Sequence, residues 1–142
     1  MNQKKFLFAA IVGAITLFVL GGLIYGVFLM NFINSHSALS PDVLVQVNKP
    51  MEKLDWVMLI LSNVAAGFLI ALVCKWGNFK THGESLKAGA MFGFLYAASI
   101  DLGFLSFTNM LTLTSAAADV LGNTVMTAVA FVVVAKLLRK SK

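Results

Sequence analysis

The chain has 142 residues, of which 59% are hydrophobic and 12% are charged, and its net charge is +5. The charged share is about half that of soluble proteins, and one soluble core of this size could not bury so much apolar surface. The composition therefore excludes a soluble domain, and orientation in a membrane explains the positive charge better than nucleic acid does. The single cysteine, Cys74, excludes an intramolecular disulfide.

Four continuous apolar segments predict four membrane-spanning helices, because a helix needs roughly 20 apolar residues to cross a hydrocarbon core of ~30 Å. They cover about residues 6–30, 55–74, 87–107 and 116–135. Strands of a membrane barrel would alternate apolar and polar residues instead. With short connections, the sequence predicts a single all-α domain over residues 1–142, an antiparallel four-helix transmembrane bundle.

The basic residues predict the orientation of this bundle. Nine of them flank the two chain ends and the connection between the second and third segments: Lys4, Lys5, Lys75, Lys80, Lys87, Lys136, Arg139, Lys140 and Lys142. Only Lys49 and Lys53 lie on the other side. By the positive-inside rule both termini should be cytoplasmic. The first apolar segment is too long for a cleaved signal peptide, so we expect it to be retained.

The longest connection, residues 33–54, allows two interpretations. Ser40 followed by Pro41 fits an N-cap with proline at the first helical position, which predicts a short surface helix ending near Val47. An extended segment is the alternative, because the valines of this stretch favour β structure. Pro50 would end either one.

Aromatic residues suggest where the second segment meets the membrane surface. Trp56 and Trp76 stand 20 residues apart, about 30 Å along a helix, which matches the hydrocarbon thickness. Tyr25 is expected to anchor the outer end of the first segment in the same way.

Small residues at four-residue spacing predict where helices pack closely. One row on the third segment begins at Ser85 and continues to Asp101. The residues expected to pack in this way are Gly22, Gly26, Gly67, Gly89, Gly93 and Ala97. Packing inside the chain and an interface with a second copy or another membrane protein both remain open.

Polar residues from three segments fall at similar depth in the outer half of the predicted membrane. They are Asp101, Asp119, Asn63, Asn123 and Thr127. An acidic residue inside a membrane costs at least ~2.5 kcal/mol at the helix centre and usually faces a bundle interior or a wet cavity. One hypothesis is an outward-facing pocket in which Asp101 accepts a proton or a cation. The alternative is a structural hydrogen-bond cluster.

Asp119 has a simpler structural interpretation of its own. It is expected in the first turn of the fourth helix, capped by Ser115, where the helix dipole favours a carboxylate. The remaining residues that could support catalysis or metal binding form no recognisable site. His36 and His82 lie on opposite sides of the membrane, and no hydrolase, zinc-protease or phosphate-loop motif is found. We therefore expect no metal, no cofactor and no enzymatic activity.

Three stretches resemble a bacterial family of small four-helix membrane proteins that bears only a domain-of-unknown-function label. They are IVGAITLFVLGGLIYGVF (residues 11–28), LKAGAMFGFLYAASIDLGF (86–104) and AAADVLGNTVMTAVAFVVVAKL (116–137). The resemblance covers most of the chain and implies the fold and the topology, but no activity. We expect the protein to lie in a bacterial inner membrane. Members more often have a histidine where this chain has Asn123. Small multidrug transporters are similar in length, but they need a glutamate in the first helix, and residues 6–30 contain no acidic residue.

Two classes of function remain. The sequence favours a structural or accessory role in the lipid bilayer, as a homo-oligomer or beside another membrane protein, because four short helices enclose little volume. The alternative is a small ion-coupled transporter or channel-like protein that uses the polar cluster around Asp101. No nucleic-acid partner is expected.

Overall fold

The computed structural model describes residues 3–139, and every regular element in that range is helical, which confirms the all-α fold class. Lys140 and Lys142, counted above for the orientation, lie outside the described residues. The elements are α1 (Gln3–Leu23), η1 (Ile24–Leu29), α2 (Met30–Ser35), α3 (Pro41–Val47), η2 (Met51–Lys53), α4 (Trp56–Gly77), α5 (His82–Phe107) and α6 (Leu113–Leu138).

Four helical segments in this range are long and apolar enough to cross a membrane, as the sequence predicts. The first runs without a break through α1, η1 and α2, so it ends at Ser35 rather than near Met30. Within it, η1 is a π-helix, in which each turn is wider than in an α-helix. π-Helical segments are rare in proteins, and those that do occur often lie at functional sites.

The connection after α2 contains the short helix α3, with Ser40 at the N-cap position and Pro41 opening the helix. The extended alternative for this stretch is therefore wrong. The following helix, α4, begins because the Asp55 carboxylate accepts a hydrogen bond from the backbone N–H of Met58 at 3.0 Å. That bond satisfies one of the donors left free at a helix start.

Both α5 and α6 begin with a capping box, in which two side chains bond reciprocally to the backbone. In α5 the pair is Thr81 and Glu84, and in α6 it is Thr112 and Ser115. The prediction that Asp119 lies in the first turn of the fourth helix is wrong, because Thr112 starts the helix earlier. Asp119 lies almost two turns inside α6, where it cannot act as a helix-start carboxylate.

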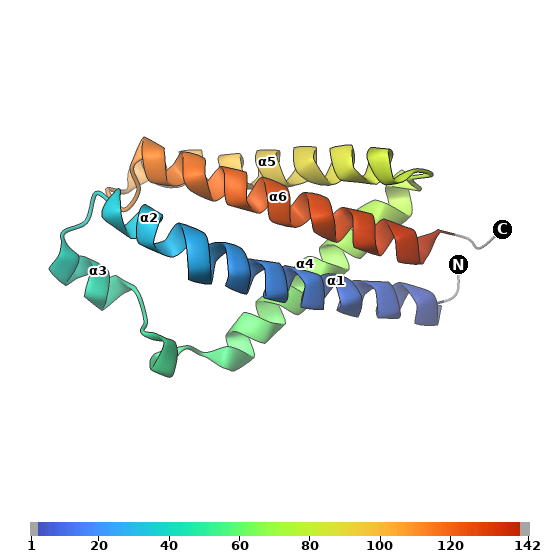
Figure 1. The fold of residues 1–142 in the computed structure, drawn as a ribbon, viewed down its shortest axis with the longest axis horizontal. Coiled ribbons are helices and arrows are strands. Elements are labelled where there is room, and N and C mark those ends of the chain that lie inside the picture. The colour runs from blue at the N-terminus through green and yellow to red at the C-terminus, as the bar shows by residue number, and fades with distance from the viewer. Residues whose placement is uncertain (1–2, 140–142) are drawn as a thin grey trace.

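The helices do not pack symmetrically (Figure 1). α5 and α6 lie side by side, while α1 packs on both α4 and α6, and α4 crosses α1 at an angle. α4 and α5 make little contact with each other. The start of α1 and the end of α6 lie at the same end of the molecule (Figure 1), where the Lys5 ammonium donates a hydrogen bond to the Arg139 carbonyl.

Most large apolar side chains face outward rather than into a core. Val27, Leu61, Leu95 and Leu121 are 55–64% exposed and come from η1, α4, α5 and α6. Phe131 and Val134 of α6 are the bulkiest apolar residues that the described helices enclose completely. Long helices that carry apolar residues on every side are typical of an integral membrane protein, because lipid covers the apolar side chains that the core does not bury.

Candidate functional site

One row of residues on α5 faces α6 along its whole length. The buried residues of α5 are Ser85, Gly89, Gly93, Ala97 and Asp101, spaced four apart. A Cβ added at Gly89 would lie 2.6 Å from Phe131 Cβ, and one at Gly93 would lie 2.8 Å from the Asn123 carbonyl oxygen. The missing side chains let α5 approach α6 closely and bring Asp101, at the end of the row, against it.

Asp101 and Asp119 face each other where α5 and α6 meet below the Thr108–Thr112 connection. The Asp101 side chain is only 7% exposed, and its Oδ2 atom has no hydrogen-bond partner among the described residues. The two carboxyl groups are close enough to interact directly. They line a cavity of about 260 Å³, and its lining residues Phe104 and Met110 are exposed, so it reaches the surface.

A hydrogen-bond network connects Tyr25 of η1, through Asn123 of α6, to Asp119. The Asn123 Nδ2 donates to Asp119 Oδ2 at 2.9 Å and to the Tyr25 hydroxyl at 2.6 Å. The Tyr25 hydroxyl in turn donates to the Asp119 carbonyl at 3.3 Å. Tyr25 belongs to the π-helical segment η1, so the irregular stretch of the first helix is the part that reaches the acidic pair.

Tyr25, predicted as an interface anchor, contacts α6 in the structure. The helical segment continues for ten further residues after Tyr25, to Ser35. Its ring is half-buried and its hydroxyl is bonded to Asn123 of α6. Trp56 and Trp76, by contrast, are 48% and 74% exposed at opposite ends of α4.

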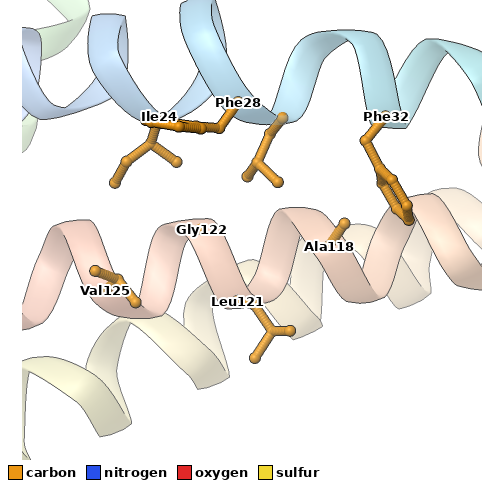
Figure 2. Close-up of a pocket in the computed structure, with 8 residues that line it drawn as sticks. Ile24, Phe28, Phe32, Ala118, Leu121, Gly122 and Val125 are labelled. Atoms are coloured by element: carbon orange, nitrogen blue, oxygen red, sulfur yellow. The ribbon is translucent and has the colours of Figure 1, made fainter.

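Close approach of η1 to α6 depends on Gly122, which is buried. A Cβ there would lie 2.5 Å from Leu29 Cδ1 and 3.4 Å from the Tyr25 hydroxyl. Figure 2 shows the apolar groove beside this contact, where the Phe32 ring projects toward Ala118 of α6. The groove has a volume of about 460 Å³, and its lining residues are all apolar.

The polar cluster predicted from sequence is divided between two cavities. Asp101 and Asp119 line the first, whereas Asn63 and Thr127 line a cleft of about 500 Å³ between α4 and α5. Asn123 lines this cleft and also bonds to Asp119, so its side chain connects the two. Asn63 lies apart from the acidic pair because α4 diverges from α5.

The glycines expected to pack differ in their surroundings. Gly67 is buried against α1, where a Cβ would lie 2.4 Å from the Ala10 carbonyl oxygen. Gly22 and Gly26 have no neighbouring atom within 4 Å of an added Cβ and are exposed. The expectation of a seam at these two is wrong within this chain, because the face of α1 that packs lies earlier, around Gly13.

At the opposite end of the α5–α6 seam the polar contacts serve the helix ends. The Arg139 guanidinium donates to the Ser85 hydroxyl at 3.4 Å and to the Phe79 carbonyl at 3.3 Å.

Nowhere in residues 3–139 do three His, Cys, Asp or Glu side chains come together as metal ligands. Searches of family models, of curated proteins and of solved structures found no match to the chain.

Proposed function

We propose that the chain is an antiparallel four-helix membrane protein that takes up a proton at the Asp101–Asp119 pair and moves it across the membrane, alone or together with a second solute. The observation that supports the proposal is a buried carboxyl group with an unpartnered oxygen, facing a second carboxyl group in a cavity. Two carboxylates that face each other in a poorly solvated site repel strongly, and one shared proton removes that repulsion.

A proton suits this site better than a metal cation does. Calcium takes six to eight oxygen ligands and magnesium takes six, as a rule of thumb. The cavity offers Asp101 and Asp119, while the Ser115 hydroxyl is already engaged in the capping box of α6. No lysine or arginine lies among its described lining residues to neutralise the pair permanently. The charge of the site can therefore change with proton uptake.

We further propose that the protein lies in a bacterial inner membrane with both termini in the cytoplasm. The basic residues Lys5, Lys75 and Arg139 come from α1, α4 and the end of α6 and lie toward one end of the molecule, which supports this orientation. The acidic cavity lies toward the other end, beside the α5–α6 connection, and would open to the outside. This arrangement supports a carrier rather than an enzyme.

The test is proton movement in liposomes that contain a pH-sensitive dye. With a pH gradient across the vesicles, the parent protein should dissipate it faster than empty vesicles do, and Asp101→Asn should abolish the difference. Asp42→Asn, which makes the same change on the exposed helix α3, is the matched control and should behave like the parent. Equal rates for the parent, Asp101→Asn and empty vesicles would contradict the proposal.

An accessory role, in which the chain stabilises another membrane protein, is the second candidate. The apolar groove between η1 and α6 supports it, because a helix of a partner could lie there (Figure 2). Its signature would be a co-purifying membrane protein that is released by Ala118→Trp, in the groove, but not by Asp101→Asn. The carrier proposal expects the reverse dependence, with activity lost only when Asp101 changes.

A further inference from the structure

The divergence of α4 from α5 leaves a cleft in the side of the molecule, with α6 as its floor. Its volume of about 500 Å³ lies in the range of pockets that hold small organic molecules. Because α4 and α5 make little contact, the cleft faces the surroundings of the helices rather than an end of the molecule. In a bilayer, a ligand would reach it from the hydrocarbon region.

Hydrogen-bonding groups in the cleft lack partners within the described chain. The Thr127 side chain is only 7% exposed, yet its hydroxyl makes no hydrogen bond there. The Tyr96 side chain is 54% exposed, and its hydroxyl makes none either. Asn63 uses its Nδ2 for the Leu59 carbonyl at 2.8 Å, which leaves its side-chain oxygen free as an acceptor. In a bilayer no water reaches such groups from the hydrocarbon side, and a polar group without a partner is costly there. These groups therefore favour a bound molecule that can pair with them.

The rest of the lining is apolar and uncharged. Phe92 and Tyr96 stack with parallel rings 5.9 Å apart and form an aromatic wall on α5. Leu17 and Met126 contribute aliphatic surface from α1 and α6, and no charged side chain is among the described residues that line the cleft. A charged ligand would therefore have no counter-ion, whereas an apolar body would be buried favourably.

From these features we infer that the cleft binds an uncharged, membrane-soluble small molecule with an apolar, preferably aromatic, body and a hydrogen-bond donor. The aromatic body packs on Phe92 and Tyr96, and the donor pairs with the free amide oxygen of Asn63 or Asn123. This inference rests on the proposed carrier function insofar as the ligand is the solute that is moved.

Asn123 provides the physical link between the two cavities. It lines the cleft and donates to Asp119 Oδ2 and to the Tyr25 hydroxyl. A ligand that bonds to Asn123 acts on a side chain that also donates a hydrogen bond to one member of the acidic pair. Ligand occupancy and proton occupancy would thus influence each other through one residue.

The test uses N-phenyl-1-naphthylamine, an uncharged aromatic amine whose fluorescence rises in apolar sites, with the protein in lipid nanodiscs. Saturable binding above that of empty nanodiscs is expected. Ser62→Trp fills the cleft from an exposed position on α4 and should weaken binding by at least about tenfold. Leu61→Trp, one residue away and outside the lining, is the control and should leave binding unchanged.

A second variant guards against loss of binding through misfolding. Asn63→Leu removes the free amide oxygen that can accept the ligand's hydrogen bond and should weaken binding several-fold, while thermal stability stays close to the parent value. Binding that is not saturable, or that Ser62→Trp and Leu61→Trp reduce equally, would overturn the inference. So would native mass spectrometry showing a phospholipid retained by the parent and lost from Ser62→Trp.

The same assay separates failure of this inference from failure of the carrier proposal. Asp101 lies outside the cleft, so Asp101→Asn should keep saturable probe binding, with only a modest change in affinity through Asn123, while losing proton movement. Saturable, Ser62-sensitive binding without any proton movement by the parent would leave the binding site standing and remove the carrier function. Proton movement that depends on Asp101 without saturable binding would remove only the cleft as a ligand site.

Discussion

The row of buried α5 residues that faces α6 differs between its two ends: one end packs tightly, and the other lines a cavity. Around Gly89, the absent side chain lets the Phe131 ring pack directly on the α5 backbone, and the contact is closed. Three turns later the row places Asp101 opposite Asp119, beside a cavity that reaches the surface. Tight packing fixes the relative position of two helices, whereas a cavity with an unpaired carboxyl group leaves room for an occupant.

The contrast extends to the first helix. Near Gly13 it is regular and packs on α4 and α6 through small residues, with Val134 against it. Near Tyr25 it becomes a π-helix and contacts α6 through a hydrogen-bond network. The structure therefore combines a close-packed half with a polar, irregular half. Substitutions in the first half should act on stability alone, and substitutions in the second half should also act on proton uptake.

The largest expected effect comes from a methyl group added at the closed end. Gly89→Ala would place a Cβ within 2.9 Å of three atoms of Phe131 and Ala128, which forces the helices apart and should cost about 2–3 kcal/mol of stability. Gly22→Ala makes the same change in open space and should be neutral within about 1 kcal/mol. Thermal unfolding in detergent measures both. An equal loss of stability in Gly89→Ala and Gly22→Ala would contradict the contrast between the close-packed contact at Gly89 and the open surface at Gly22.

A smaller loss is expected from the network that supports the acidic pair. Asn123→Leu removes the hydrogen bonds to Asp119 Oδ2 and to Tyr25, which should cost about 1–2 kcal/mol. Asn63→Leu is the comparison, since the Asn63 amide bonds only to the backbone of its own helix, and it should cost less than about 0.5 kcal/mol. The same unfolding assay applies. If Asn63→Leu proved the more damaging, the network would not be the element that ties η1 to α6.

The smallest expected effect concerns one hydroxyl group. Tyr25→Phe removes the group that accepts from Asn123 at 2.6 Å and should cost about 1 kcal/mol. Tyr96→Phe removes a hydroxyl that makes no hydrogen bond within residues 3–139 and should leave stability unchanged. Proton movement in liposomes should slow for Tyr25→Phe alone. Identical behaviour of the two variants would contradict the role given to Tyr25.

Local spacing was enough to predict several parts of the structure. The lengths of the apolar segments predict the four long helices, and the four-residue period predicts a single face carrying Ser85 through Asp101. The Ser40–Pro41 pair points to the start of α3. These features depend only on neighbours along one helix, which a sequence displays directly.

The remaining features depend on how helices meet. The sequence of the first segment does not predict the change to a π-helix near Tyr25, and the contacts of that stretch with Gly122 and Asn123 of α6 lie far away in sequence. The separation of Asn63 from Asp101 follows from the angle of α4, which spacing does not encode. The capping pair Thr112 and Ser115, by contrast, was visible in the sequence and would have corrected the position of Asp119.

The central claim is that the Asp101–Asp119 pair holds one exchangeable proton, and infrared spectroscopy of the protein in nanodiscs tests it most directly. At neutral pH the parent should show the carbonyl band of a protonated carboxylic acid. Asp101→Asn should lose that band because the like-charge repulsion that holds the shared proton is removed, whereas Asp42→Asn on the exposed helix α3 should retain it. A parent spectrum without the band, or a band that survives both Asp101→Asn and Asp119→Asn, would contradict the account.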